Sequence, residues 1–115
     1  MDKKRTLIFY KNNFSEFFDK LPVNVQNKID QVLYMVMVLE RIPIKFFQHM
    51  TGTEGLYEIR VEFGSDIYRI FSCFDEGNLV VLFNGFQKKS QKTPKKEIEK
   101  ALSLKAEYFS EKQNH

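Results

Sequence analysis

The spacing of apolar residues predicts a strand and two helices in the first third of the chain. Residues 5–11 are rich in β-branched and aromatic types and predict the strand. A short helix is expected from Phe14 to Leu21, where apolar residues recur every three or four positions. Pro22 then opens an amphipathic helix that extends to about Glu40. The apolar face of this second helix is formed by Val25, Ile29, Val32, Leu33, Val36 and Leu39.

The pattern changes to alternation after a loop expected at residues 43–54. Apolar and polar residues alternate through 56–63, and a tight turn then leads to a second strand at 67–74, so this pair is expected to form a β-hairpin. Another turn leads to a third strand at 79–83. Because that strand is apolar on both faces, we expect it to lie inside the sheet and to be covered on both sides.

A last helix is predicted from the pair Thr93-Pro94, which suits a cap and a first turn. Its tail, from Ser110 to residue 115, is expected to fray. The order β-α-α-β-β-β-α predicts an α+β fold, in which an antiparallel sheet packs against two N-terminal helices and is joined by a C-terminal helix. The 115 residues are interpreted as a single domain. The apolar stripe of the last helix consists of Ile98, Ala101, Leu102, Tyr108 and Phe109.

The composition is that of a globular domain with one aromatic-rich core, since 43% of the residues are hydrophobic, including twelve Phe and five Tyr. No apolar run approaches the length of a membrane span, and the one near the N-terminus is too short for a signal peptide. The single Cys73 cannot form an intramolecular disulfide, which suits a reducing compartment. We therefore expect a cytoplasmic protein.

Several familiar active sites are excluded because the sequence lacks their motifs. The chain has no phosphate-binding P-loop, no dinucleotide-binding fingerprint, no zinc-protease motif and no nucleophile elbow. His49 is expected in a loop and His115 ends the chain, and with one cysteine they do not make a usual zinc set, so no metal or cofactor is expected. Cys73 lies in an apolar strand and is expected to be packed rather than reactive.

Positive charge is concentrated in one short segment. The net charge of the chain is +3, yet residues 86–96 hold five lysines and no acid. The remaining thirteen basic and fifteen acidic residues sum to −2. A local patch of this kind suits a polyanion such as nucleic acid, although a solvated lysine-rich loop is the alternative.

Four cations are candidates for chemistry on a phosphate. Arg60 lies on the polar face of the first hairpin strand, Arg69 interrupts the apolar second strand, and Lys88 and Lys89 are expected just past the third strand. Arginine binds two oxygens of one phosphate and keeps its charge at any working pH. Because clustered lysines lower one another's pKa, one of the pair could transfer a proton near neutral pH.

Each candidate also has a simpler interpretation, which the sequence leaves open. Arg69 is expensive to bury unless it is paired, and Glu58 or Glu62 across the hairpin could pair with it. Arg60 could be paired in the same way. Phe86 could stack on an RNA base or belong to the core. The remaining lysines of the segment could contact an RNA backbone or simply be solvated; they are Lys92, Lys95 and Lys96.

Three segments resemble the phage-associated, HigB-like branch of the RelE/ParE toxin superfamily. They are residues 55–60 (GLYEIR), 68–71 (YRIF) and 82–94 (LFNGFQKKSQKTP), and the last is the most specific. The resemblance implies a RelE-like fold and a partner antitoxin, often of the helix-turn-helix type. It also implies a type II toxin that cuts messenger RNA on the ribosome without a metal, through attack of the 2′-hydroxyl on the adjacent phosphate.

The resemblance places catalytic cations at Arg60, Arg69 and the pair Lys88 and Lys89. Some relatives use a late histidine or tyrosine as the proton donor, but residues 86–101 contain neither, so lysine is the candidate here. Two other functions stay open. The superfamily includes ParE-like members that inhibit DNA gyrase and cut no RNA, and a degenerate member could serve only as an antitoxin-binding module. Contacts to RNA are expected from Phe86, Lys92, Lys95 and Lys96.

Overall fold

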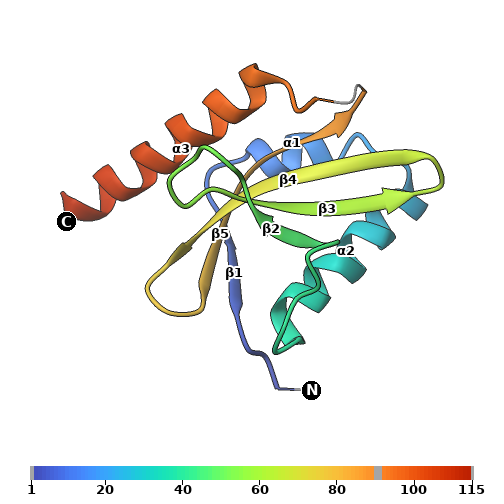
Figure 1. Ribbon diagram of the computed structural model, residues 1–115, viewed down its shortest axis with the longest axis horizontal. Helices are drawn as coiled ribbons and strands as arrows, with labels where there is room; N and C mark the ends of the chain where they lie inside the picture. The colour runs from blue at the N-terminus through green and yellow to red at the C-terminus, as the bar shows by residue number, and fades with distance from the viewer. Residues whose placement is uncertain (1, 90–91, 115) are drawn as a thin grey trace.

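The structure is a computed structural model, described here for residues 2–89 and 92–114 (Figure 1). A five-stranded sheet with the strand order β1-β5-β4-β3-β2 is combined with helices, so the predicted α+β class is confirmed. The three consecutive antiparallel strands that the alternation predicted are also confirmed. In chain order the elements are β1 (Thr6–Phe9), α1 (Asn13–Phe18), α2 (Val23–Val38), β2 (Phe47–His49), β3 (Tyr57–Phe63), β4 (Asp66–Asp75), β5 (Leu79–Lys88) and α3 (Lys95–Gln113).

The two edges of the sheet differ from the prediction. β1 pairs in parallel with β5, so the sheet is mixed rather than wholly antiparallel. A parallel pair needs a long connection, which the intervening helices and strands supply. The loop expected at 43–54 contains β2, which pairs with β3 and includes His49. Three residues are too few to show a periodic pattern in the sequence. β2 is a strand because it pairs with β3.

β5 continues to Lys88, five residues beyond its predicted end at Phe83. The polar residues from Asn84 onward interrupt the apolar pattern, but pairing with β4 keeps this part of the chain extended. Phe86 and Lys88 are therefore strand residues, whereas the sequence placed Lys88 just past the strand. In this register Phe86 is opposite Arg69.

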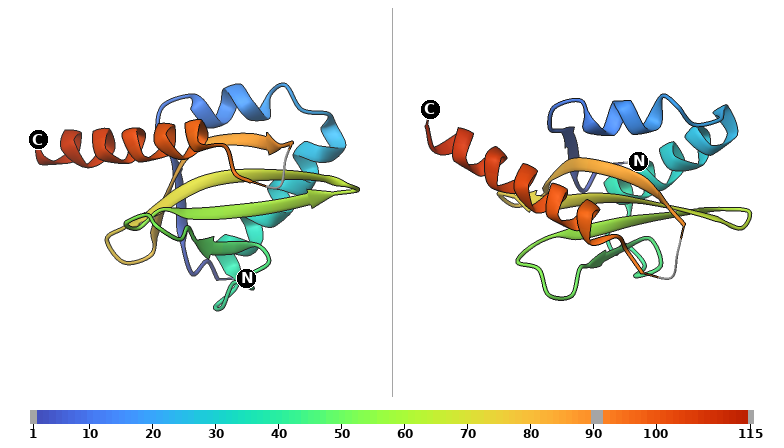
Figure 2. Two further views of the ribbon diagram at one scale, coloured as in Figure 1. Left: turned by 45° about the horizontal axis from the view of Figure 1, so that its top comes forward. Right: turned by 90° about the horizontal axis from the view of Figure 1, so that it is seen from above.

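The sheet carries an apolar cluster on each face. α1 and α2 cover one face, as predicted for the N-terminal helices, and α3 covers part of the other (Figure 2). β5 is thus an inner strand with apolar packing on both sides, which confirms its predicted position. The contact with α1 is close at Gly85, where an added Cβ would lie 2.5 Å from the ring of Phe17. Any larger residue there would push α1 away from the sheet.

α3 begins at Lys95, with Pro94 at the N-cap position rather than in the first turn. It continues to Gln113, so residues 110–113 of the tail that is expected to fray are helical in the structure. Buried Asp75 at the end of β4 accepts hydrogen bonds of 2.7 Å from the Tyr108 hydroxyl and 2.8 Å from Lys112, which hold the helix on the sheet. Within the described ranges, no helix combines the length and apolar character needed to cross a bilayer.

Candidate functional site

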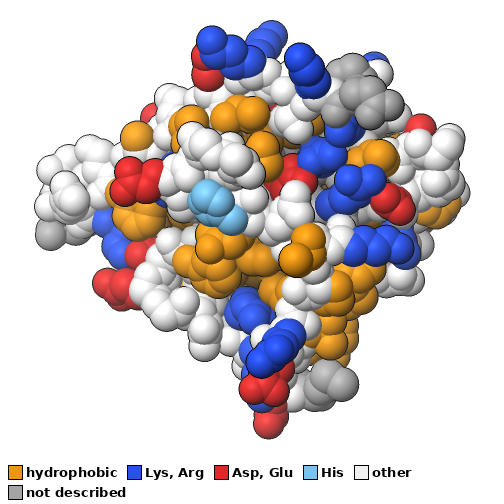
Figure 3. Space-filling view, viewed as in Figure 1, with side chains coloured by type: hydrophobic (Ala, Val, Ile, Leu, Met, Phe, Trp, Pro, Cys, Tyr) orange, Lys and Arg blue, Asp and Glu red, His pale blue; other side chains and the backbone are white. Residues whose placement is uncertain are grey.

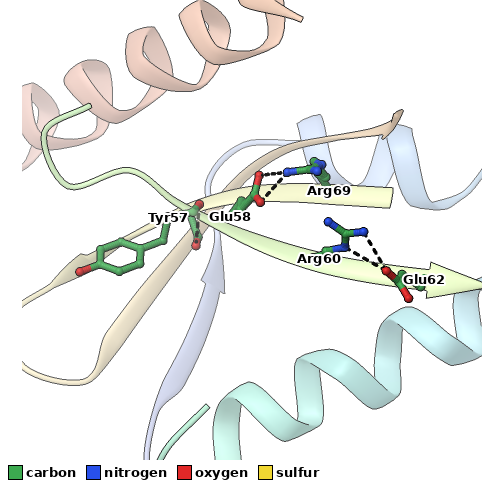
Figure 4. Close-up of polar contacts among 6 residues, drawn as sticks. Tyr57, Glu58, Arg60, Glu62 and Arg69 are labelled. Atoms are coloured by element: carbon green, nitrogen blue, oxygen red, sulfur yellow. Dashed lines mark hydrogen bonds and ion pairs between the residues drawn. The ribbon is translucent and has the colours of Figure 1, made fainter. Parts of the chain in front are cut away.

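Polar side chains from the neighbouring strands β3, β4 and β5 share the face of the sheet that α3 partly covers, and Figure 4 shows those of β3 and β4. Phe71 and Phe86 belong to the apolar cluster of that face. Arg69 is two residues from Phe71 along β4, and Lys88 is two residues from Phe86 along β5, so all four side chains point the same way. Glu58 of β3 is opposite Phe71 and therefore lies on this face as well.

Arg69 and Glu58 form a buried ion pair. Nη1 of Arg69 donates to both carboxylate oxygens of Glu58, and the two residues are only 6% and 2% exposed. The pairing across the hairpin that the sequence left open is thus present. Nε of Arg69 is buried and has no hydrogen-bond partner among the residues that the structure describes. One donor of this guanidinium is therefore both buried and unpaired among the described residues.

Arg60 is opposite Arg69 in the β3–β4 register and has its own carboxylate. Its Nε and Nη2 donate to Oε1 of Glu62, at 3.1 and 2.8 Å. Without acids, two arginines directly across a ladder would repel each other. With Lys88, the site combines three cations and two carboxylates, so its net charge is smaller than the three cations alone would give. Glu58 and Glu62 were not part of the site predicted from the sequence. Their spacing of two residues on either side of Arg60 nevertheless indicated that all three side chains share one face of the strand.

Lys88 is the lysine that interacts with the arginine pair. It is half-buried, and the pKa of its ammonium group is lowered, first by burial and then by the charges of Arg69 and Arg60, while Glu58 opposes the effect. The lowered pKa agrees in direction with the prediction, but burial contributes more than the predicted repulsion. Lys89 is exposed and lies just outside β5. Within the predicted pair, Lys88 is the better-placed residue.

The other expected RNA contacts divide into two groups. Phe86 is 9% exposed and packs on Phe71, with ring centroids 5.5 Å apart, so it belongs to the core and offers no open face for a base. Lys92, Lys95 and Lys96 are exposed, and Lys95 lies 3.8 Å from Glu99 in the same helix. Figure 3 shows lysine and arginine side chains gathered right of centre, interspersed with acidic ones.

A cavity of about 330 Å³ adjoins Arg60 at the β2 edge of the sheet. No group of three or more His, Cys, Asp or Glu residues that could hold a metal ion occurs in the described parts of the chain, and His115 lies outside them. Cys73 is buried, and burial raises the pKa of its thiol to about 11, so the expectation of a packed cysteine is confirmed. The cavity is lined by Ile44, Lys45, Gln48, Glu58, Arg60 and Glu62.

Comparison with known families decides what kind of chain this is. Residues 16–106 match the family described as "Phage derived protein Gp49-like (DUF891)". The chain belongs to this Gp49-like family. The matched residues include β2 to β5 and most of α3, and thus all the residues of the site.

The Gp49-like protein is also similar in structure to a chain of the RelB-RelE antitoxin-toxin complex from Methanococcus jannaschii. The TM-score is 0.52, the sequence identity is 17%, and the match covers 76% of this chain and 99% of that one. At such low identity the likeness concerns the fold, and it confirms the RelE-like fold that the sequence resemblance implied. No curated protein matches the chain.

Proposed function

We propose that the Gp49-like protein is the toxin of a type II toxin–antitoxin system and cuts translated messenger RNA in the cytoplasm. Its partners would be the ribosome and an antitoxin, of the helix-turn-helix type that the HigB-like resemblance implies. Family membership and the fold shared with a chain of an antitoxin-toxin complex support this proposal. The observation that carries it is the convergence of Arg60, Arg69 and Lys88 on one face of the sheet.

The reaction that suits these residues is transfer of a phosphate within the RNA. The 2′-oxygen forms a bond to the adjacent phosphorus while the bond to the 5′-oxygen breaks, which leaves a cyclic phosphate and a free 5′-hydroxyl. Negative charge grows on the non-bridging oxygens, where two guanidinium groups stabilise it. Nε of Arg69, a buried donor without a partner among the described residues, is a candidate for this task once a phosphate displaces the side chains that cover it. A phosphate oxygen would remove the cost of leaving it unpaired.

Proton transfer falls to Lys88 in this proposal. The 2′-hydroxyl must lose a proton and the 5′-oxygen must gain one. An ordinary lysine, with a pKa of about 10.4, is almost fully protonated at neutral pH and is a poor base. The lowered pKa of Lys88 increases its neutral fraction, so it exchanges a proton more readily. The exposed Lys92, Lys95 and Lys96 would contact the messenger or ribosomal backbone.

Induced expression without an antitoxin tests the proposal. Growth should stop, and mapping of transcript ends should reveal cuts in translated regions but none in a reporter that lacks its start codon. Arg60→Ala should reduce cleavage by about a hundredfold, the usual effect of removing one transition-state donor. Arg41→Ala, an exposed arginine outside the site, is the matched control and should cut normally.

Two results would contradict messenger cleavage. Intact transcripts together with accumulating gyrase–DNA cleavage complexes would identify a ParE-like inhibitor of gyrase. A chain that binds an antitoxin yet neither arrests growth nor cuts RNA would be an antitoxin-binding module.

A further inference from the structure

The cavity beside Arg60 has the size and position of a subsite for part of a bound RNA. Its volume of about 330 Å³ is within the range of small-molecule sites. Arg60 and Glu58 belong both to the cavity lining and to the phosphate site. A group held in the cavity would therefore adjoin a phosphate bound by Arg60 and Arg69. The base of the nucleotide that carries this phosphate is the group within reach.

The cavity lining offers an apolar surface and polar groups that can donate or accept hydrogen bonds. Ile44 is 75% exposed, which is high for a large apolar residue, and it can pack on the flat face of a base. Gln48 is exposed on β2 opposite Glu58, and its amide both donates and accepts. Oε1 of Glu62 accepts both bonds from Arg60, whereas Oε2 accepts none from any residue that the structure describes.

We propose that this cavity binds one base of the substrate RNA and that Glu62 and Gln48 make it favour guanine; this inference rests on the proposed function. Proteins read unstacked RNA bases through the hydrogen bonds of their edges. A carboxylate only accepts, so it suits a base edge that presents adjacent donors. Guanine does so through N1–H and the N2 amino group. The edges of adenine, cytosine and uracil each place an acceptor beside a donor, and that acceptor would face a carboxylate oxygen.

Binding of uncleavable trinucleotides tests the subsite without catalysis. The probes carry methyl groups on their 2′-oxygens, so they cannot be cleaved. The two probes of a pair have guanine or hypoxanthine at the same position and differ only by the N2 amino group. NMR titration should give about tenfold tighter binding of the guanine probe, the size expected for one good base contact. Glu62→Gln should abolish this difference, because Arg60 keeps the amide oxygen and the amide NH2, a donor, then faces the donors of the base. Gln48→Ala should weaken binding of both probes.

Matched controls lie on the other side of the sheet. Glu40→Gln and Gln31→Ala change exposed residues at the end of α2 and on α2 itself, and should leave both affinities unchanged. Far-UV circular dichroism and melting temperatures establish that every variant is folded. Equal binding of the two probes at each of the three positions would overturn the subsite, and so would a guanine preference that survives Glu62→Gln in a folded protein.

Mapped cuts in cells separate this inference from the proposed function. The wild type should cut with guanine enriched at one fixed position, and Glu62→Gln should lose the enrichment in the cuts that remain. Cleavage of translated messages without base enrichment would overturn the subsite and leave the proposed function standing. Absence of any cleavage, combined with discrimination between the two probes, would overturn the proposed function and leave a guanine-binding cavity.

Discussion

Replacement of Arg69 by alanine is expected to destabilise the fold as well as to stop cleavage. The variant leaves the Glu58 carboxylate, which is 2% exposed, without the guanidinium that donates to both its oxygens. Removing one partner of a buried ion pair typically costs about 3–5 kcal/mol. For a domain of roughly this size each kcal/mol lowers the melting temperature by about 4 °C, so we expect a drop of about 12–20 °C.

A double variant separates the structural role of Arg69 from its role on the phosphate. Glu58→Leu combined with Arg69→Met replaces the pair by apolar side chains, and such replacements are often neutral or stabilising. The double variant should recover most of the lost stability, yet it should cut no RNA because it has no guanidinium at this position. Urea denaturation followed by circular dichroism measures the free energy of unfolding, and mapped transcripts measure cleavage. Arg41→Ala is the control for both assays.

Two outcomes would refute this reasoning. If the free energy of unfolding of Arg69→Ala lies within about 1 kcal/mol of the wild-type value, which is the size expected for an exposed ion pair, the buried carboxylate does not depend on Arg69. If the folded double variant cuts normally, Arg69 is purely structural and the phosphate must be held by other groups.

The remaining predictions concern proton transfer, ribosome binding and pH. Lys88→Arg should abolish cleavage in single-turnover assays, because arginine keeps the charge but cannot release its proton, whereas Lys89→Arg should retain it. Lys95→Ala and Lys96→Ala should each weaken ribosome association and reduce the salt slope by about one, since each removes one backbone contact. Asp75→Asn should lower the melting temperature at neutral pH, because a lysine and a tyrosine of α3 hold the pKa of this carboxyl below its ordinary value of 3.8. That stabilisation is complete above pH 3.8 and is lost as the pH falls through the lowered pKa, so the melting temperatures of wild type and variant should converge in strong acid.

Most helices and strands could be predicted from the sequence where apolar residues recur with a regular local period. Alternation through 56–63 and the turn after it predicted the β3–β4 hairpin, and the helical spacing of Val25, Ile29 and Val32 predicted α2. Both patterns reflect the exposure of successive side chains, which neighbouring residues alone determine. The same reasoning failed at β2 and at the extension of β5, because pairing with another strand creates or prolongs those elements. It predicted the strand β1 but not its parallel pairing with β5, which depends on a distant part of the chain.

The sequence by itself identified the candidate cations and placed Arg60 and Arg69 on neighbouring strands of a hairpin. It could not determine their neighbours, because period two fixes the face of a side chain, whereas register fixes what lies beside it. Only the tertiary structure set Arg69 against Glu58, placed Phe86 in the core and made burial the main cause of the lowered pKa of Lys88. Burial and ion pairing depend on residues brought together from different strands and from α3, so no window of the sequence contains them.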